Sequence, residues 1–230
     1  MKPNILTALL MSGLLSLAAC ESANQQSQKD SSATVPAKQA TDEPTKTVLF
    51  FGDSLTAGYG LEDPASDAYP SVIQEEIKKA NLPYTVVNAG NSGETSAGGL
   101  GRIDWVLKQK VDVFVLELGA NDGLRGIAVA ETTRNLQAII NRVKTKYPKA
   151  KLVLTGMQIP PSMGAVYVSD FKEMFPKLAA KNNMTLVPFL LDKVGGISKL
   201  NQGDGIHPTK EGAKVVASNV WVVLKDVLGS

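Results

Sequence analysis

The chain has 230 residues, 43% of them hydrophobic, and its 24 lysines and arginines nearly balance its 22 acidic residues. This is the composition of an ordinary globular protein, and it gives no electrostatic bias toward nucleic acid. Because the chain has one cysteine and one histidine, it cannot form an intramolecular disulfide and lacks the ligands of a usual zinc site. We therefore expect neither a nucleic-acid partner nor a metal.

The first predicted element is an export signal at residues 1–19. Lys2 precedes an apolar run from Ile5 to Ala19 that is too short, and too small in its side chains, for a membrane span. The run ends in Leu-Ala-Ala-Cys at residues 17–20, which resembles the lipobox of bacterial lipoproteins. The resemblance implies an exported lipoprotein, anchored to a membrane through a lipid on Cys20 and facing the periplasm or the cell surface. A soluble secreted protein with a cysteine in its signal is the alternative.

After Cys20 the composition changes to Ser, Gln, Thr, Lys, Ala and Pro, with almost no large apolar residue. Such a segment cannot bury enough apolar surface to order itself. We expect the lipidated cysteine and a disordered tether over residues 20–45, followed by a single domain of typical size over residues 46–230.

Within the domain, short apolar runs rich in β-branched residues predict five strands, at residues 47–51, 84–88, 111–117, 151–155 and 185–188. Most of these runs do not alternate with polar residues, as is typical of strands covered on both faces. Segments with helical spacing lie between them, and a last helix is predicted to begin at Pro208, since proline suits the first helical turn. Strands that alternate with helices indicate a parallel sheet between helix layers, an α/β fold. No G-x-G-x-x-G follows the first strand, so we expect no dinucleotide cofactor.

Residues suited to catalysis follow the predicted strands: Ser54, Gly93, Asn121, Met157 and, further along the last loop, Asp204 and His207. In an open parallel sheet the ligand site lies beyond the carboxyl ends of the strands. We therefore expect these residues at one edge of the sheet.

A serine at this edge needs a base before it can act as a nucleophile, and imidazole is best matched to that task. His207 is the one histidine in the chain, and Asp204 stands three residues before it, where a carboxylate can hold the ring by one nitrogen. Hydrolysis by an activated Ser54 is the leading hypothesis. The alternative is a loop histidine that is hydrogen-bonded locally.

Acyl transfer also needs donors for the negative charge that develops on the carbonyl oxygen. The side-chain amide of Asn121 and the backbone N–H groups of Gly93 and Ser54 are the candidates for this oxyanion hole. Alternatively, Gly93 serves a turn, and Asn121 with Asp122 caps a helix.

Together these motifs resemble those of the SGNH, or GDSL, hydrolase superfamily. Gly-Asp-Ser-Leu at residues 52–55, Gly93, Gly-Ala-Asn-Asp at 119–122 and Asp-Gly-Ile-His-Pro at 204–208 stand in family order, and the resemblance spans nearly all of residues 46–228. It implies a three-layer α/β/α sandwich with a flavodoxin-like five-stranded parallel sheet in the order 2-1-3-4-5. It also implies Ser54 as nucleophile, His207 as base and acid, Asp204 as its orienter, and the oxyanion hole named above.

The longer run of residues 117–126 resembles the branch that contains thioesterase I, lysophospholipase L1 and arylesterases. Ala120 departs from that branch, which often has glycine there. An alanine is harmless at this position unless the backbone needs a positive φ.

The segment after the fourth strand bears on the substrate. Its flexible apolar side chains Met157, Ile159, Met163 and Tyr167 are candidates to wall an acyl chain; alternatively, Met157 and Ile159 belong to the core and the nearby prolines stiffen a loop. The resemblance implies a serine esterase acting on small esters, thioesters or lipids, with aryl esters and lysophospholipids as substrates. A carbohydrate O-deacetylase and a catalytically silent lipoprotein that binds a ligand are the other two hypotheses.

Overall fold

The computed structural model describes residues 45–229. The predicted signal at residues 1–19, Cys20 and nearly all of the predicted tether lie outside the described residues. Over residues 45–229, none of the helices combines the length and the apolar character that a membrane span requires. Export and lipidation therefore stay predictions.

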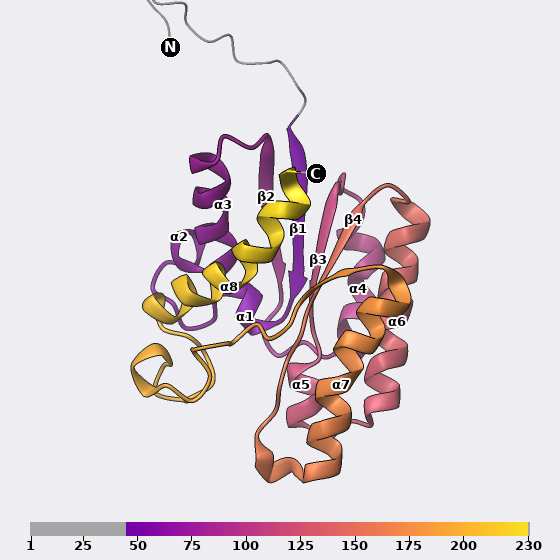
Figure 1. Ribbon diagram of the computed structural model, residues 1–230, viewed down its shortest axis with the longest axis vertical. Coiled ribbons are helices and arrows are strands. Elements are labelled where there is room, and N and C mark those ends of the chain that lie inside the picture. Colours follow the sequence, from indigo (N-terminus) through magenta and orange to yellow (C-terminus); the bar gives the residue numbers. More distant parts are fainter. Residues whose placement is uncertain (1–44, 230) are drawn as a thin grey trace, which may run out of the picture. The chain divides into compact units, whose positions relative to one another are not determined.

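A five-stranded parallel sheet in the order β2-β1-β3-β4-β5 forms the centre of the domain (Figure 1). Its strands are β1 (Lys46–Gly52), β2 (Tyr84–Gly90), β3 (Val113–Glu117), β4 (Lys151–Thr155) and β5 (Thr185–Val187). All of β3 and residues 48–52 of β1 are buried, as continuous apolar runs in covered strands must be. The predicted α/β fold and the strand order 2-1-3-4-5 are confirmed.

Helices cover both faces of this sheet: α1 (Ser54–Ala57), α2 (Pro64–Asp67), α3 (Tyr69–Lys79), α4 (Ser96–Val106), α5 (Ala120–Leu124), α6 (Val129–Lys146), α7 (Ala165–Asn182) and α8 (Lys210–Gly229), with short 3-10 turns η1 (Pro161–Met163) and η2 (Ser198–Leu200). The connection from β1 to β2 runs one way across the sheet, and those after β2 run the other way. Because such crossovers are right-handed, α3 lies on one face, where it packs against α8, and α4, α6 and α7 lie on the other (Figure 1).

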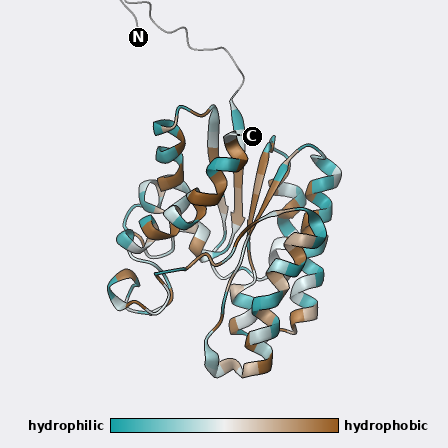
Figure 2. Cartoon of the chain, viewed as in Figure 1, coloured by the Kyte–Doolittle hydropathy of each residue, from teal (hydrophilic) through white to brown (hydrophobic). Residues whose placement is uncertain are grey.

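The helices dock through apolar stripes that are visible from the sequence. In α6 the buried residues Leu136, Ile139, Ile140 and Val143 recur at helical spacing. Figure 2 shows hydrophobic strands at the centre and helices that are hydrophilic on their outer sides. Burial of these stripes against the sheet holds the strand ends in fixed positions.

The last helix begins at Lys210, so the predicted start at Pro208 is wrong. Pro208 instead forms an isolated antiparallel bridge with Asn201. The Thr209 hydroxyl accepts a hydrogen bond from Gly212 N at 3.2 Å, as a helix cap does. This bridge closes the loop of residues 201–208, which carries Asp204 and His207.

Candidate active site

Ser54 lies in the turn between the central strand β1 and the short helix α1. Asp53 precedes it and caps α1, because its Oδ1 accepts a hydrogen bond from Leu55 N at 3.0 Å. The helix ends after one turn at Gly58, whose φ of 76° is left-handed. Ser54 is 9% exposed. The fold therefore presents a serine hydroxyl at the carboxyl edge of the sheet, in the first turn of a helix.

The loop of residues 201–208 brings His207 onto this serine. His207 Nε2 lies 2.9 Å from Ser54 Oγ, and His207 Nδ1 lies 2.6 Å from Asp204 Oδ2. Asp204 Oδ1 also accepts the backbone N–H groups of Ile206 and His207 at 2.9 and 3.0 Å. The structure thus brings together the three residues that the sequence predicted.

The charge on Asp204 determines which group donates and which accepts in these hydrogen bonds. The hydrogen bond with His207 and the two backbone N–H groups lower the pKa of Asp204 to about 2. Asp204 is therefore a carboxylate at neutral pH and accepts the proton of Nδ1. Nε2 of the neutral ring is left without a proton and can accept one from Ser54.

Two residues that sequence reasoning missed hold the histidine in place. The Tyr59 ring packs against the His207 ring with centroids 4.7 Å apart. Gln202 Nε2 donates to Tyr59 O and Pro208 O at 2.8 and 2.9 Å, and Gln202 N donates to His207 O at 2.7 Å. Gln202 thereby joins the loop of the nucleophile to the loop of the base.

Besides Ser54 N–H at the start of α1, the two other predicted oxyanion donors lie on two adjoining segments. Gly93, in the loop after β2, has a φ of 78°, and its carbonyl accepts a hydrogen bond from Arg125 Nη2 at 3.0 Å. Asn121 lies in α5, directly after β3, and its Nδ2 donates to Asp53 Oδ2 at 3.1 Å. Because Arg125 follows α5, its side chain ties the two segments to each other.

The two neighbours of Asn121, Ala120 and Asp122, have structural roles. The positive φ before α5 belongs to Gly119, at 119°, and Ala120 has none, so alanine is accommodated there. Asp122 does not cap its own helix, because its Oδ2 accepts from Ser96 N at 2.7 Å at the start of α4. It fixes α5 against α4.

A cavity of about 570 Å³ opens beside Ser54 and His207. Its apolar lining consists mainly of Leu55, Leu124, Met157, Ile159, Pro160, Pro161, Phe189, Leu191 and Ile206. Met163 and Tyr167, also predicted for the substrate, are not among the lining residues. Tyr167 instead contacts the segment between α5 and α6, because its hydroxyl donates to Ile127 O at 2.6 Å.

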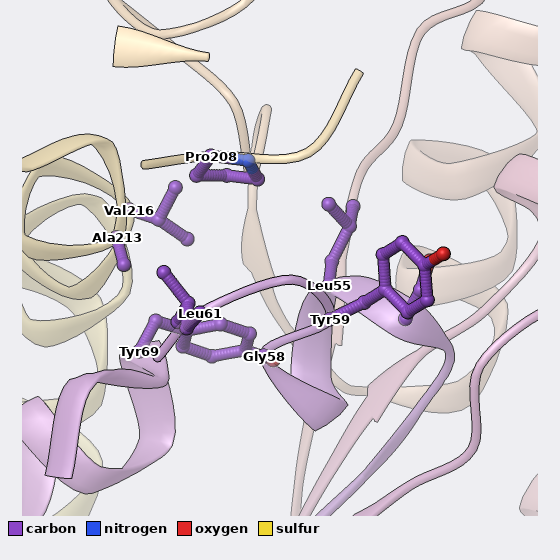
Figure 3. A pocket seen from close by; sticks show the side chains of 9 residues that line it. Leu55, Gly58, Tyr59, Leu61, Tyr69, Pro208, Ala213 and Val216 are labelled. Atoms are coloured by element: carbon purple, nitrogen blue, oxygen red, sulfur yellow. The ribbon is translucent and has the colours of Figure 1, made fainter. Parts of the chain in front are cut away.

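A second, apolar cavity that Ser54 also lines lies between α1 and α8 (Figure 3). Leu55, Leu61, Pro208 and Val216 close it to about 10 Å³. That volume holds at most one water molecule. Of these two cavities lined by Ser54, the larger one has room for an acyl chain.

No cluster of three or more His, Cys, Asp or Glu side chains suited to a metal ion occurs in residues 45–229. What the site offers is a hydroxyl with an adjacent base, amide donors and an apolar cavity, which together suit acyl transfer.

Comparison with known proteins agrees with this geometry. A model of the GDSL-like lipase/acylhydrolase family matches residues 50–215. The esterase TesA of Pseudomonas aeruginosa is 39% identical over 184 residues, which cover 80% of this chain and 90% of that protein. The thioesterase 1/protease 1/lysophospholipase L1 of Escherichia coli K12 is 37% identical over 172 residues, which cover 74% of this chain and 79% of that protein.

The similarity extends to three dimensions. A crystal structure of TesA, 39% identical in sequence, matches with a TM-score of 0.75 and covers 80% of this chain and 100% of that one. With sequence and fold in agreement, this chain belongs to the GDSL-like lipase/acylhydrolase family, as its motifs predicted.

Proposed function

We propose that this protein hydrolyses carboxylic esters and thioesters of short to medium acyl chains through an acyl-enzyme on Ser54. Hydrolysis of carboxylic esters follows from the family to which the chain belongs. The observation that carries the finer assignment is the unbroken contact from Asp204 through His207 to Ser54, at 2.6 and 2.9 Å.

The proposed reaction has two halves. Ser54 Oγ attacks the ester carbonyl carbon while its proton passes to His207 Nε2, and Asp204 stabilises the resulting imidazolium. The tetrahedral intermediate then collapses, and the leaving alcohol or thiol takes that proton. Water next attacks the acyl-enzyme, gives its proton to Nε2 and releases the acid, and the proton returns to Ser54.

The apolar cavity supports an acyl chain as the group it accepts. Its volume of about 570 Å³ falls within the range of about 300–1,000 Å³ that is usual for small-molecule sites. Aryl esters and lysophospholipids are proposed substrates, because each joins an ester to a substantial apolar group.

A panel of esters tests this proposal. We expect p-nitrophenyl esters of four to ten carbons and 1-acyl-lysophosphatidylcholine to be hydrolysed with higher kcat/KM than p-nitrophenyl acetate or acetylated xylan. Hydrolysis of acetylated xylan alone would indicate an O-deacetylase. Absence of turnover on every ester, together with saturable ligand binding, would indicate a silent binding protein.

Replacement of Asn121 by alanine is expected to lower kcat by about 10²- to 10³-fold with a much smaller change in KM. The amide is proposed to act on the oxyanion, which exists only near the transition state. Steady-state kinetics on one p-nitrophenyl ester measure this split.

Asn182→Ala is the matched control for Asn121→Ala. The Asn182 amide is also hydrogen-bonded, to Gln137 Oε1 and Leu178 O, but it lies at the end of α7, away from the carboxyl ends of the strands. Its loss is expected to lower thermal stability and leave kcat unchanged. A folded Asn121→Ala protein with wild-type kcat would remove Asn121 from the oxyanion hole.

We further propose that the protein is an exported lipoprotein anchored through Cys20, as the Leu-Ala-Ala-Cys sequence at residues 17–20 predicts. Cys20→Ser is expected to release the protein from the membrane fraction or to leave the signal uncleaved. Fractionation and mass spectrometry of the mature N-terminus measure this. A mature protein that begins at another residue and carries no lipid would contradict the anchor.

A further inference from the structure

Behind the proposed nucleophile lie two buried carboxyl groups that the reaction just described does not use. Asp53 and Glu117 are each 1% exposed. Register brings them together, because Gly52 of β1 pairs with Glu117 of β3. A Cβ at residue 52 would collide with Glu117 Oε2 and with Thr56 Oγ1. The glycine of the Gly-Asp-Ser motif therefore makes room for a carboxyl group.

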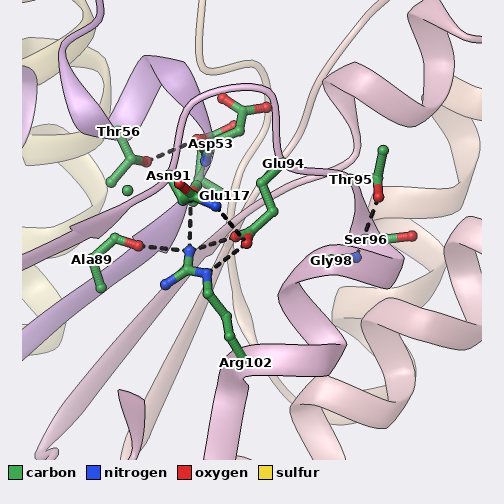
Figure 4. Close-up of polar contacts among 12 residues, drawn as sticks. Asp53, Thr56, Ala89, Asn91, Glu94, Thr95, Ser96, Gly98, Arg102 and Glu117 are labelled. Carbon is green, nitrogen blue, oxygen red and sulfur yellow. Dashed lines mark hydrogen bonds and ion pairs between the residues drawn. The ribbon is translucent and has the colours of Figure 1, made fainter. Parts of the chain in front are cut away.

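Glu117 holds both ends of the turn that carries Ser54. Its Oε2 accepts hydrogen bonds from Asp53 N at 3.1 Å and from Thr56 Oγ1 at 2.8 Å (Figure 4). The Tyr69 hydroxyl lies 2.9 Å from Thr56 Oγ1 and completes this chain of contacts. The residue before Ser54 and a residue in the helix after it are thus fixed to one buried side chain.

Asp53 links Glu117 to Asn121 through hydrogen bonds. Its Oδ1 caps α1 through Leu55 N, and its Oδ2 accepts from Asn121 Nδ2 at 3.1 Å. A side-chain amide has two N–H donors in a fixed plane. When one of them is bound to Asp53, the direction of the other is set.

The pKa shifts of Asp53 and Glu117 agree with the hydrogen bonds just described. Burial raises the pKa of Asp53 to about 6. Burial and then the charge on Asp53 raise the pKa of Glu117 well above its usual range. Two buried carboxyl groups this close cannot both ionise readily, so the ionised form of Asp53 favours the protonated form of Glu117.

The other groups that face Asp53 and Glu117 do not remove this difference between their pKa values. Tyr69, from α3, is buried, and this burial raises the pKa of its hydroxyl well above the usual value. His207, from the loop after β5, favours the charged form of Asp53. Arg102, from α4, donates to Gly52 O and to Ala89 O and forms an ion pair with Glu94 (Figure 4). Its charge is compensated by that partner.

We propose that Glu117 is a positioning residue of the oxyanion hole, acting through Asp53 on the orientation of the Asn121 amide. This inference deepens the proposed function and rests on the role assigned there to Asn121. Glu117 touches neither the substrate nor Ser54 Oγ. Its effect is to hold the acceptor of one Asn121 N–H, so that the other N–H faces the developing negative charge.

Two substitutions at residue 117 separate positioning from packing. Glu117→Gln keeps an oxygen that accepts from Asp53 N and Thr56 Oγ1 and an N–H that donates to Asp53, so kcat is expected within about threefold of wild type. Glu117→Met keeps the length of the side chain but neither polar function. We expect it to lower kcat by about 10- to 100-fold and to change KM by no more than about twofold. This loss of kcat is smaller than the loss expected for Asn121→Ala, because the Asn121 amide is still present and only its orientation is disturbed.

Active-site titration with a fluorophosphonate corrects each kcat for the fraction of folded enzyme. Asn182→Leu is the matched control, since it also removes a buried hydrogen-bonded side chain, remote from the site, and it is expected to leave the corrected kcat unchanged. A wild-type corrected kcat in Glu117→Met, or equal losses in Glu117→Gln and Glu117→Met, would overturn the proposal.

NMR of the Asn121 side-chain amide tests the same claim without turnover, and it decides the matter if Glu117→Met does not fold. The two N–H resonances, assigned by their absence in Asn121→Ala, are expected to shift with pH as the carboxyl pair ionises, with a different midpoint in Glu117→Gln. Resonances that are constant from pH 4 to 9, or an unchanged midpoint, would overturn the proposal. Because this readout needs no substrate, failure of the ester panel would count against the proposed function and not against this inference.

Discussion

Ser54→Ala is expected to lower kcat for ester hydrolysis by about 10⁴- to 10⁶-fold, since it removes the nucleophile of the proposed acyl-enzyme. The fold should be retained, because the Ser54 hydroxyl is hydrogen-bonded only to the His207 ring among the side-chain contacts described for residues 45–229. Steady-state kinetics and thermal unfolding on the same preparation measure the two quantities.

Ser92→Ala is the matched control, because Ser92 is an exposed serine on the neighbouring loop after β2. It is expected to keep wild-type activity. If Ser54→Ala retained more than about a tenth of the wild-type kcat, or if Ser92→Ala lost activity to the same extent, Ser54 would not be the nucleophile.

Asp204→Asn is expected to lower kcat at neutral pH by about 10³-fold. The amide cannot compensate the charge of the imidazolium, and its NH₂ group favours the ring tautomer with the proton on Nε2, which cannot accept from Ser54. The loss should fall short of that seen where such an aspartate is fully buried, because the Asp204 side chain is 39% exposed and water partly solvates the ring in its place. Kinetics at neutral pH, with circular dichroism as the control for folding, measure the effect.

Because His207 is the proposed base, we expect an acid limb in the pH profile of kcat/KM. Activity requires an unprotonated Nε2 as the base, so kcat/KM should fall at acidic pH as that base becomes protonated. Asp53 is a second group in this window, because burial raises its pKa to about 6. Below that pH Asp53 becomes neutral and is a weaker acceptor for the Asn121 amide, which also lowers activity.

NMR separates the two ionisations. The ring protons of His207, the one histidine of the chain, are expected to titrate together with the kinetic limb. A ring that titrates well away from that limb, with the limb displaced in Asp53→Asn, would assign the limb to Asp53. Substantial activity in His207→Ala would exclude His207 as the base.

Much of the fold could be predicted because its signals are local. Central strands covered on both faces read as continuous apolar runs, and the predicted strand at residues 151–155 coincides with β4. The contacts of Ser54 with His207 follow from topology, since residues after parallel strands meet at one edge. The start of α8 was misplaced because the bridge of Pro208 with Asn201 is tertiary and leaves no local pattern.

The residues that support the site could not be found in this way. Glu117 reads as the polar end of a strand, and its burial depends on its register with Gly52, 65 positions earlier in the sequence. Gln202 reaches Tyr59 across 143 positions. The one sequence signal for Glu117 is a carboxylate that directly follows four apolar strand residues, where a buried charge is costly unless it is hydrogen-bonded or neutral.

Mass spectrometry after reaction with a fluorophosphonate tests the assignment of the nucleophile most directly. We expect one phosphonyl adduct per chain, on the peptide that contains Ser54, with no adduct in Ser54→Ala and slower labelling in Asp204→Asn. An adduct on any other serine, or undiminished labelling of Ser54→Ala, would contradict the account.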